Sequence, residues 1–175
     1  MFRYYRKPQF IKRLSLAAVF IFMSAVSSFA CLCAGESTVA QSFKGASAVF
    51  VGKFIREEYR SGIKNELHEV GMEAWGKKGE SYEVLVHIFQ VDRWWKGAGT
   101  YEVVLITDHT RNKDGSESIS DCGLGFEPGK EYLVYAHEDG DHISTNACSR
   151  TRNIKRAAGD IKRLNRLAKP RRTSV

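Results

Sequence analysis

Hydrophobic and polar residues alternate in short runs along much of the chain, and this pattern predicts a mainly β domain. The strongest run is residues 82–91, where aliphatic and polar side chains partly alternate. Four further runs predict strands, at residues 48–55, 101–107, 131–136 and 142–146. About five short strands suit a five-stranded Greek-key barrel.

Two helices are expected beside the barrel. Apolar residues at helical spacing predict a short helix from Ser37 to Lys44, with Ser37 as its cap. A second helix is predicted from Asn153 to Ala168, because its apolar positions fall on one face, and Pro170 ends it.

The remaining polar stretches are predicted as connections. Residues 57–80 and 108–120 are expected to be long loops, and residues 94–97, which read Trp-Trp-Lys-Gly, a turn. The run from His137 to His142 contains enough histidine and acid for a metal cluster. Its Asp-Gly pair favours a polar hairpin turn instead.

The first thirty residues have the pattern of a secretory signal peptide. Residues 1–13 are basic, and residues 14–30 form an uncharged apolar run that ends in Ser28-Phe29-Ala30. Small residues in this spacing indicate cleavage after Ala30, and therefore secretion or transfer to the periplasm or cell envelope. An uncleaved anchor is one alternative, and acylation of Cys31, as in a lipoprotein, is another.

The net charge of +7 is distributed unevenly. Residues 31–149 contain nineteen acidic and twelve basic residues, whereas residues 150–175 contain ten basic residues and one acid. The positive charge therefore lies at the two ends, and we expect no specific nucleic-acid binding. The basic tail predicts either a solvated helix packed on an acidic barrel or a contact with an anionic surface.

Four cysteines, Cys31, Cys33, Cys122 and Cys148, are expected to form two disulfides after export. A bond between Cys31 and Cys33 is geometrically poor in an extended chain. Two pairings stay open, and either one closes two long loops, each worth roughly 4–5 kcal/mol. The bridges would stabilise a modest core, or hold the start of the exported chain rigid for binding. A zinc site is a further alternative.

The chain contains no residue pattern of a known catalytic site, and we expect no enzymatic activity. It has no His-Glu-x-x-His pair, and Asp121, a candidate base, has no companion nucleophile once the cysteines are bridged. Trp94 and Trp95 are candidates for stacking bases, although at a strand end one of them is expected in the core.

Several features together resemble the family of tissue inhibitors of metalloproteinases, and more narrowly the exported bacterial members of that netrin-like group. They are a signal peptide ending before Cys-x-Cys, the strand AVFVGKF, the WWKG turn, the run CGLGFEPGKEYLVYA and the closing CSRT. The resemblance covers residues 31–151, so we expect a signal peptide at 1–30, this domain at 31–151 and a basic helix and tail at 152–175.

The resemblance implies an OB-fold barrel, with disulfides Cys31–Cys122 and Cys33–Cys148. It also implies that the α-amine and carbonyl of Cys31 chelate the catalytic zinc of a target metalloprotease. Leu32 would enter the primed-side pocket, and Cys33 would complete this inhibitory edge. The chain would need no cofactor of its own, since the zinc belongs to the target.

The sequence departs from the animal members of the family. It lacks their third disulfide and their six-cysteine C-terminal domain, and Leu32 replaces a small polar residue. A second hypothesis is therefore a netrin-like binding or scaffold module of the cell envelope, which binds through residues 57–80 and 108–120. A third is an anion-binding module that uses the tail with Trp94 and Trp95.

Overall fold

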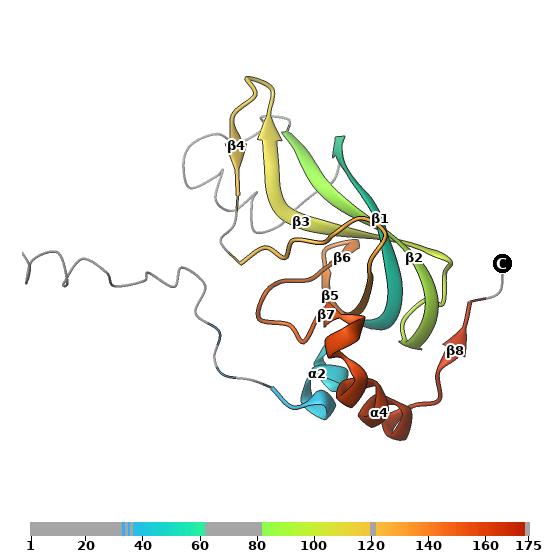
Figure 1. Cartoon of the computed structure of the whole chain (residues 1–175). Helices are drawn as coiled ribbons and strands as arrows, with labels where there is room; N and C mark the ends of the chain where they lie inside the picture. Colours follow the sequence, from blue (N-terminus) through green and yellow to red (C-terminus); the bar gives the residue numbers. More distant parts are fainter. Residues whose placement is uncertain (1–32, 34, 36, 62–81, 120–121, 174–175) are drawn as a thin grey trace, which may run out of the picture. The chain divides into compact units, whose positions relative to one another are not determined.

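The computed structural model describes residues 33, 35, 37–61, 82–119 and 122–173, and their fold is mainly β with two α-helices (Figure 1). The strands are β1 (Ala48–Ser61), β2 (Tyr82–Lys96), β3 (Glu102–Asn112), β4 (Glu117–Ser118), β5 (Glu131–Asp139), β6 (His142–Ser144), β7 (Arg152–Asn153) and β8 (Arg171–Arg172). The helices are α2 (Val39–Gly45), a 3₁₀ turn (Ile154–Arg156) and α4 (Ala158–Leu167). The predicted signal peptide lies outside the described residues.

Five of the strands pair in a closed ring. β1 pairs antiparallel with β2 and with β5, β2 pairs with β3, and β5 pairs with β6. A short parallel pairing between β3 and β6 closes the ring. Each predicted strand run overlaps one of these five strands, although the runs at 101–107 and 142–146 extend one and two residues beyond β3 and β6. The prediction of a mainly β domain is confirmed.

Residues 48–52 of β1 are buried on both faces, which explains the continuous apolar run at the start of the strand. Phe50 and Phe54 pack with Phe89 and Trp94 in the core cluster shared by the ring strands. Val49, whose neighbours in the chain face that cluster, belongs instead to a second cluster formed with the two helices. Alternate residues of one strand thus supply two separate cores.

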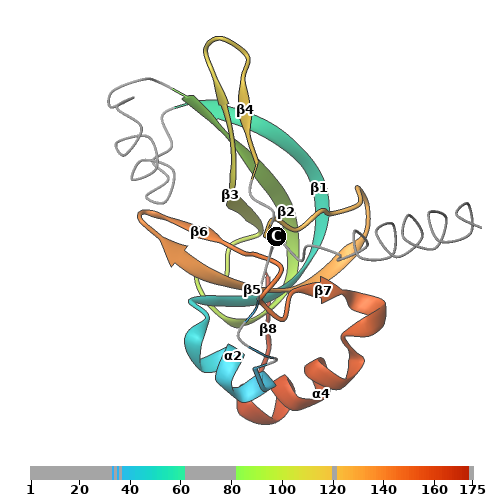
Figure 2. The same cartoon turned by 90° about the vertical axis from the view of Figure 1, so that its left-hand side faces the viewer.

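The helices cover one side of the ring, where α2 and α4 contact each other (Figures 1 and 2). The N-cap of α2 is Thr38, not the predicted Ser37, because Thr38 and Gln41 form a reciprocal capping box. The predicted second helix is divided at Ala157 into a 3₁₀ turn and α4. Leu164 of α4 is fully buried in the cluster with the helices.

Two predicted loops and one predicted turn are partly wrong, because strands run through them. β1 continues to Ser61 and β3 to Asn112, and β2 continues through both tryptophans to Lys96. Three register shifts between β1 and β2 allow this long pairing to bend. The rest of the predicted loop at 57–80, residues 62–80, lies outside the described residues.

The turn after β2 depends on Gly97. Its φ of +111° favours glycine, and a Cβ placed there would lie 2.6 Å from the Trp94 ring. The predicted hairpin turn between β5 and β6 is confirmed, with Gly140 at a φ of +57°. Within the described part of the chain, no helix is long and apolar enough to cross a membrane.

Candidate functional site

The anchor of the N-terminal segment is a disulfide between Cys33 and Cys148, which joins residues 115 positions apart with a Cα–Cα distance of 5.3 Å. Cys122 is also disulfide-bonded. The backbone N–H of Ala147 donates to the Cys122 carbonyl at 2.8 Å. Cys122 and Cys148 therefore belong to neighbouring stretches of backbone, although 26 positions separate them in the sequence.

A tight turn fixes the position of Cys148. The side-chain oxygen of Asn146 accepts hydrogen bonds from the backbone N–H groups of Cys148 at 3.0 Å and Ser149 at 3.1 Å. Such an Asx turn holds the backbone without help from a regular element. The half-cystine is thus presented from a rigid turn, and Cys33 itself is exposed.

Arg150 connects this anchor to both helices. Its guanidinium donates to the Ser37 carbonyl at 2.6 Å and to both carboxylate oxygens of Asp160 at 2.9 Å each. The side chains of Arg150 and Asp160 are only 16% and 10% exposed. This bidentate pair therefore holds the chain that follows Cys33 against α4.

The two residues expected to carry the inhibitory chemistry, Cys31 and Leu32, lie outside the described residues, as does Asp121. Cys33 and Cys148 form the bridge that the family resemblance implies. The bridge Cys31–Cys122 involves a residue that is not described, and it stays a prediction.

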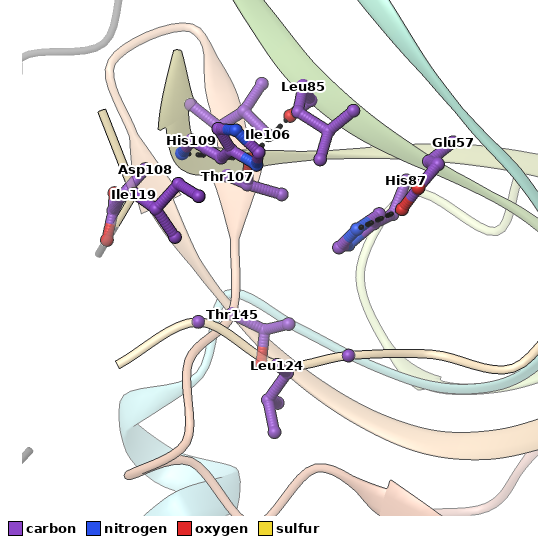
Figure 3. A pocket seen from close by; sticks show the side chains of 12 residues that line it. Glu57, Leu85, His87, Ile106, Thr107, Asp108, His109, Ile119, Leu124 and Thr145 are labelled. Atoms are coloured by element: carbon purple, nitrogen blue, oxygen red, sulfur yellow. Dashed lines mark hydrogen bonds and ion pairs between the residues drawn. The ribbon is translucent and has the colours of Figure 1, made fainter. Parts of the chain in front are cut away.

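A second candidate site is a cavity of about 320 Å³ at the end of the ring away from the helices (Figure 3). Leu124 and Thr145 lie across it from the side chains of β2 and β3. The lining contains the apolar residues Leu85, Ile106, Ile119 and Leu124, and the titratable residues Glu57, His87, Asp108 and His109. It is therefore an amphipathic hollow, as ligand sites commonly are.

His87 is the buried titratable group of this cavity. The residue is 6% exposed, and Phe54 and Phe126 pack edge-on against its ring. Its Nε2 lies 3.6 Å from a carboxylate oxygen of Glu57, its partner across β1 and β2. Burial lowers the pKa of His87, and this outweighs the opposing effect of Glu57. Burial therefore favours the neutral form of the imidazole.

A polar cluster borders the cavity on the long strands. The Tyr59 hydroxyl donates to Glu117 at 2.9 Å and lies 3.1 Å from the His109 Nε2, and the Arg111 guanidinium stacks 3.8 Å from the Tyr59 ring. Burial, followed by the hydrogen bond to Glu117, raises the pKa of Tyr59. The same hydrogen bond, with one from His109, lowers the pKa of Glu117. These groups stabilise one another.

Other candidate residues occupy structural positions. Trp94 and Trp95 are 1% and 5% exposed, which confirms the expectation of a tryptophan in the core and contradicts the alternative in which they stack on bases. Their indole N–H groups donate to the Thr100 carbonyl and the Asn165 side chain. No group of three or more metal-ligating side chains occurs among the residues that the structure describes.

No model of a known protein family matches the chain, and no curated protein is significantly similar to it.

Sequence reasoning did not identify two features of these sites, the Arg150–Asp160 pair and the His87–Glu57 pair. One signal for the first was available, since Asp160 is the only acid among residues 150–175. The second depends on the register of β1 against β2, which is interrupted by three shifts and has no local sequence signature.

Proposed function

We propose that the chain is an exported inhibitor of a zinc endopeptidase, built on an OB-fold and acting through the α-amine and carbonyl of Cys31. The strand ring supports the fold. When the five ring strands are numbered along the chain, their spatial order around the ring is first, second, third, fifth and fourth. The parallel pairing of the third with the fifth closes the ring. This order supports the small Greek-key barrel that the proposal requires.

The observation that carries the proposal is the proximity of two half-cystines next to the start of the expected mature chain. Cys33 forms a disulfide with Cys148. The Cys122 carbonyl accepts a hydrogen bond from the backbone N–H of Ala147, the residue before Cys148. Alternate residues of an extended chain are roughly 7 Å apart. This proximity supports a Cys-x-Cys segment that bonds both Cys122 and Cys148.

The surroundings of Cys33 suit an exposed, preorganised edge. Cys33 and Gly35 are exposed, so a partner has access to this segment. Arg150 holds the Ser37 carbonyl, and the capping box at Thr38 fixes the start of α2. A segment ordered during folding loses less entropy when it binds.

The chemistry requires a neutral amine beside a carbonyl oxygen. A catalytic zinc keeps one coordination position open for water, and a five-membered N,O chelate can displace that water. An α-amine has a pKa of about 7.7–8.0, so the metal readily displaces its proton near neutral pH. Burial of Leu32 in an apolar pocket would add roughly 1.5–3 kcal/mol.

The decisive experiment compares a chain that begins at Cys31 with the same chain carrying one extra alanine before Cys31. Mass spectrometry establishes that the first form has a free, unacylated amine. In assays against a panel of zinc endopeptidases, we expect the extension to weaken inhibition by at least about 100-fold, because it removes the chelate. Equal inhibition by both forms would contradict the mechanism.

A second candidate function is a netrin-like binding module with no peptidase target. The cavity favours it, because its lining includes Glu57, Asp108, His109 and Ile119, which lie in the stretches that this hypothesis assigns to binding. In that case a folded chain with a verified free Cys31 amine inhibits no member of the panel.

A further inference from the structure

The C-terminal segment exposes a continuous series of cations. We call this set the cationic belt, and it comprises Lys155, Arg156, Lys162, Arg163, Arg166, Lys169, Arg171 and Arg172. It begins in the 3₁₀ turn, continues along α4 and ends on β8, and Figure 2 shows the path of the backbone through these elements. All eight residues are exposed.

The segment does not neutralise this charge itself. Its one acid, Asp160, is buried, and the carboxylate accepts two hydrogen bonds from Arg150. The Arg152 guanidinium lies 3.8 Å from the same carboxylate. Among the described residues, no carboxylate lies within 4.0 Å of a belt nitrogen. The barrel is acidic in composition, but it does not pair with the belt through contacts of described side chains.

The end of the belt is held in an electrostatically unfavourable position. In the pairing of β8 with β2, Arg172 lies directly opposite Arg93. Like charges at opposed positions destabilise a strand pair. Arg171 donates to the Gly97 carbonyl at 2.8 Å, a neutral acceptor that leaves its charge in place. Asp92 lies 3.8 Å from Arg93 and offsets part of this repulsion, and a bound anion would offset more of it.

We propose that the cationic belt binds an anionic polysaccharide. This inference goes beyond peptidase inhibition and does not rest on it. The belt changes direction between the 3₁₀ turn, α4 and β8 (Figure 2). A flexible polyanion can follow such a path with successive sulfate or carboxylate groups, because its affinity comes from many separated charge contacts.

A membrane fits the belt less well. An interfacial helix binds a bilayer by burying its apolar face among the lipids. In α4 that face is already occupied, since Leu164 is fully buried and Ile161 packs in the cluster with the helices. Leu167, at 47% exposed, is the one large apolar side chain that α4 leaves open.

A single-stranded nucleic acid also fits less well. Such ligands are held by aromatic side chains that stack on the bases. Both neighbouring tryptophans are buried. Tyr101, which is 45% exposed, lies in a hollow lined by two carboxylates, Asp92 and Glu131, and one cation, Lys53. The carboxylates outnumber the cation, so the hollow does not favour phosphate groups.

The test uses immobilised heparin as the probe and two variants with the same loss of charge. The belt variant is Lys162→Gln/Arg163→Gln/Arg166→Gln. The control is Lys53→Gln/Lys113→Gln/Lys130→Gln, which changes exposed lysines elsewhere. At about 0.15 M ionic strength, where only close charges act strongly, we expect the belt variant to lose about tenfold or more in affinity and the control less than about twofold.

Three results overturn the proposal. They are no binding of heparin by the unmodified chain, equal weakening in both variants, and tighter binding to phosphatidylserine vesicles or to oligo-dT than to heparin. Because the substituted side chains are exposed, circular dichroism should show that both variants fold. A second belt variant, Lys155→Gln/Arg156→Gln/Lys169→Gln, must give the same loss through different residues.

Discussion

The helix-covered side of the strand ring and its cavity end differ in the charge state of their buried polar groups. On the helix-covered side, Arg150 and Asp160 are both charged and largely buried, and the guanidinium donates three hydrogen bonds. At the cavity end, His87 is equally buried, but burial lowers its pKa and its carboxylate neighbour Glu57 is 59% exposed.

This difference indicates what each end is built for. A charged side chain can be buried when other groups satisfy its hydrogen bonds. A buried titratable side chain without such partners favours its neutral form. The helix-covered side is therefore cross-linked for stability, and its outer surface carries the cationic belt. The cavity end keeps a hollow next to a group that changes charge with pH.

The largest expected effect on stability comes from the disulfide of the helix-covered side. Replacing both Cys33 and Cys148 by serine removes a cross-link that spans 115 residues. In the chain-entropy model such a loop contributes about 4–5 kcal/mol to the free energy of unfolding. Urea unfolding of the variant and the unmodified chain measures this loss. A loss below about 1 kcal/mol would show that the bridge does not constrain the unfolded chain.

The next largest effect is expected at Asp160. Replacing Asp160 by alanine leaves the Arg150 charge buried without its carboxylate, and we expect the free energy of unfolding to fall by about 3 kcal/mol. The matched control is Arg152→Gln, since Arg152 is 34% exposed and lies 3.8 Å from Asp160. In that control the free energy of unfolding should fall by less than about 1 kcal/mol. Equal losses in urea unfolding would mean that burial of the pair does not matter.

The alternation of apolar residues was sufficient to predict the β class and the position of each ring strand. It underestimated strand length, because residues 57–61 are polar and look like a loop. They are held in β1 by pairing with β2, for example Tyr59 with Leu85. Likewise, the two tryptophans of β2 look like the start of a turn, whereas each is buried in a different core cluster. Pairing between distant segments, which local pattern does not report, decided both cases.

The candidate sites were predictable only where covalent chemistry left a signal. The cysteine spacing indicated long-range bridges, and Cys33–Cys148 is one of them. Arg150 and Asp160 are ten positions apart, with β7 and the 3₁₀ turn between them, and they form hydrogen bonds in the folded chain. Their pairing follows from the tertiary fold, as does the meeting of His87 with Glu57.

The smallest expected effect tests the cavity end through pH. Burial holds the pKa of His87 below its unfolded value of about 6.5, with His109 acting in the same direction and Glu57 against it. As the pH falls below about 6.5, the unfolded chain takes up this proton first, so the free energy of unfolding decreases. Between about pH 7.5 and 5.5, His87→Leu should lose less stability than the unmodified chain in urea unfolding. Glu57→Gln should lose more, because it removes the carboxylate that favours the imidazolium. The same loss in all three proteins would show that His87 does not set the pH response of this end.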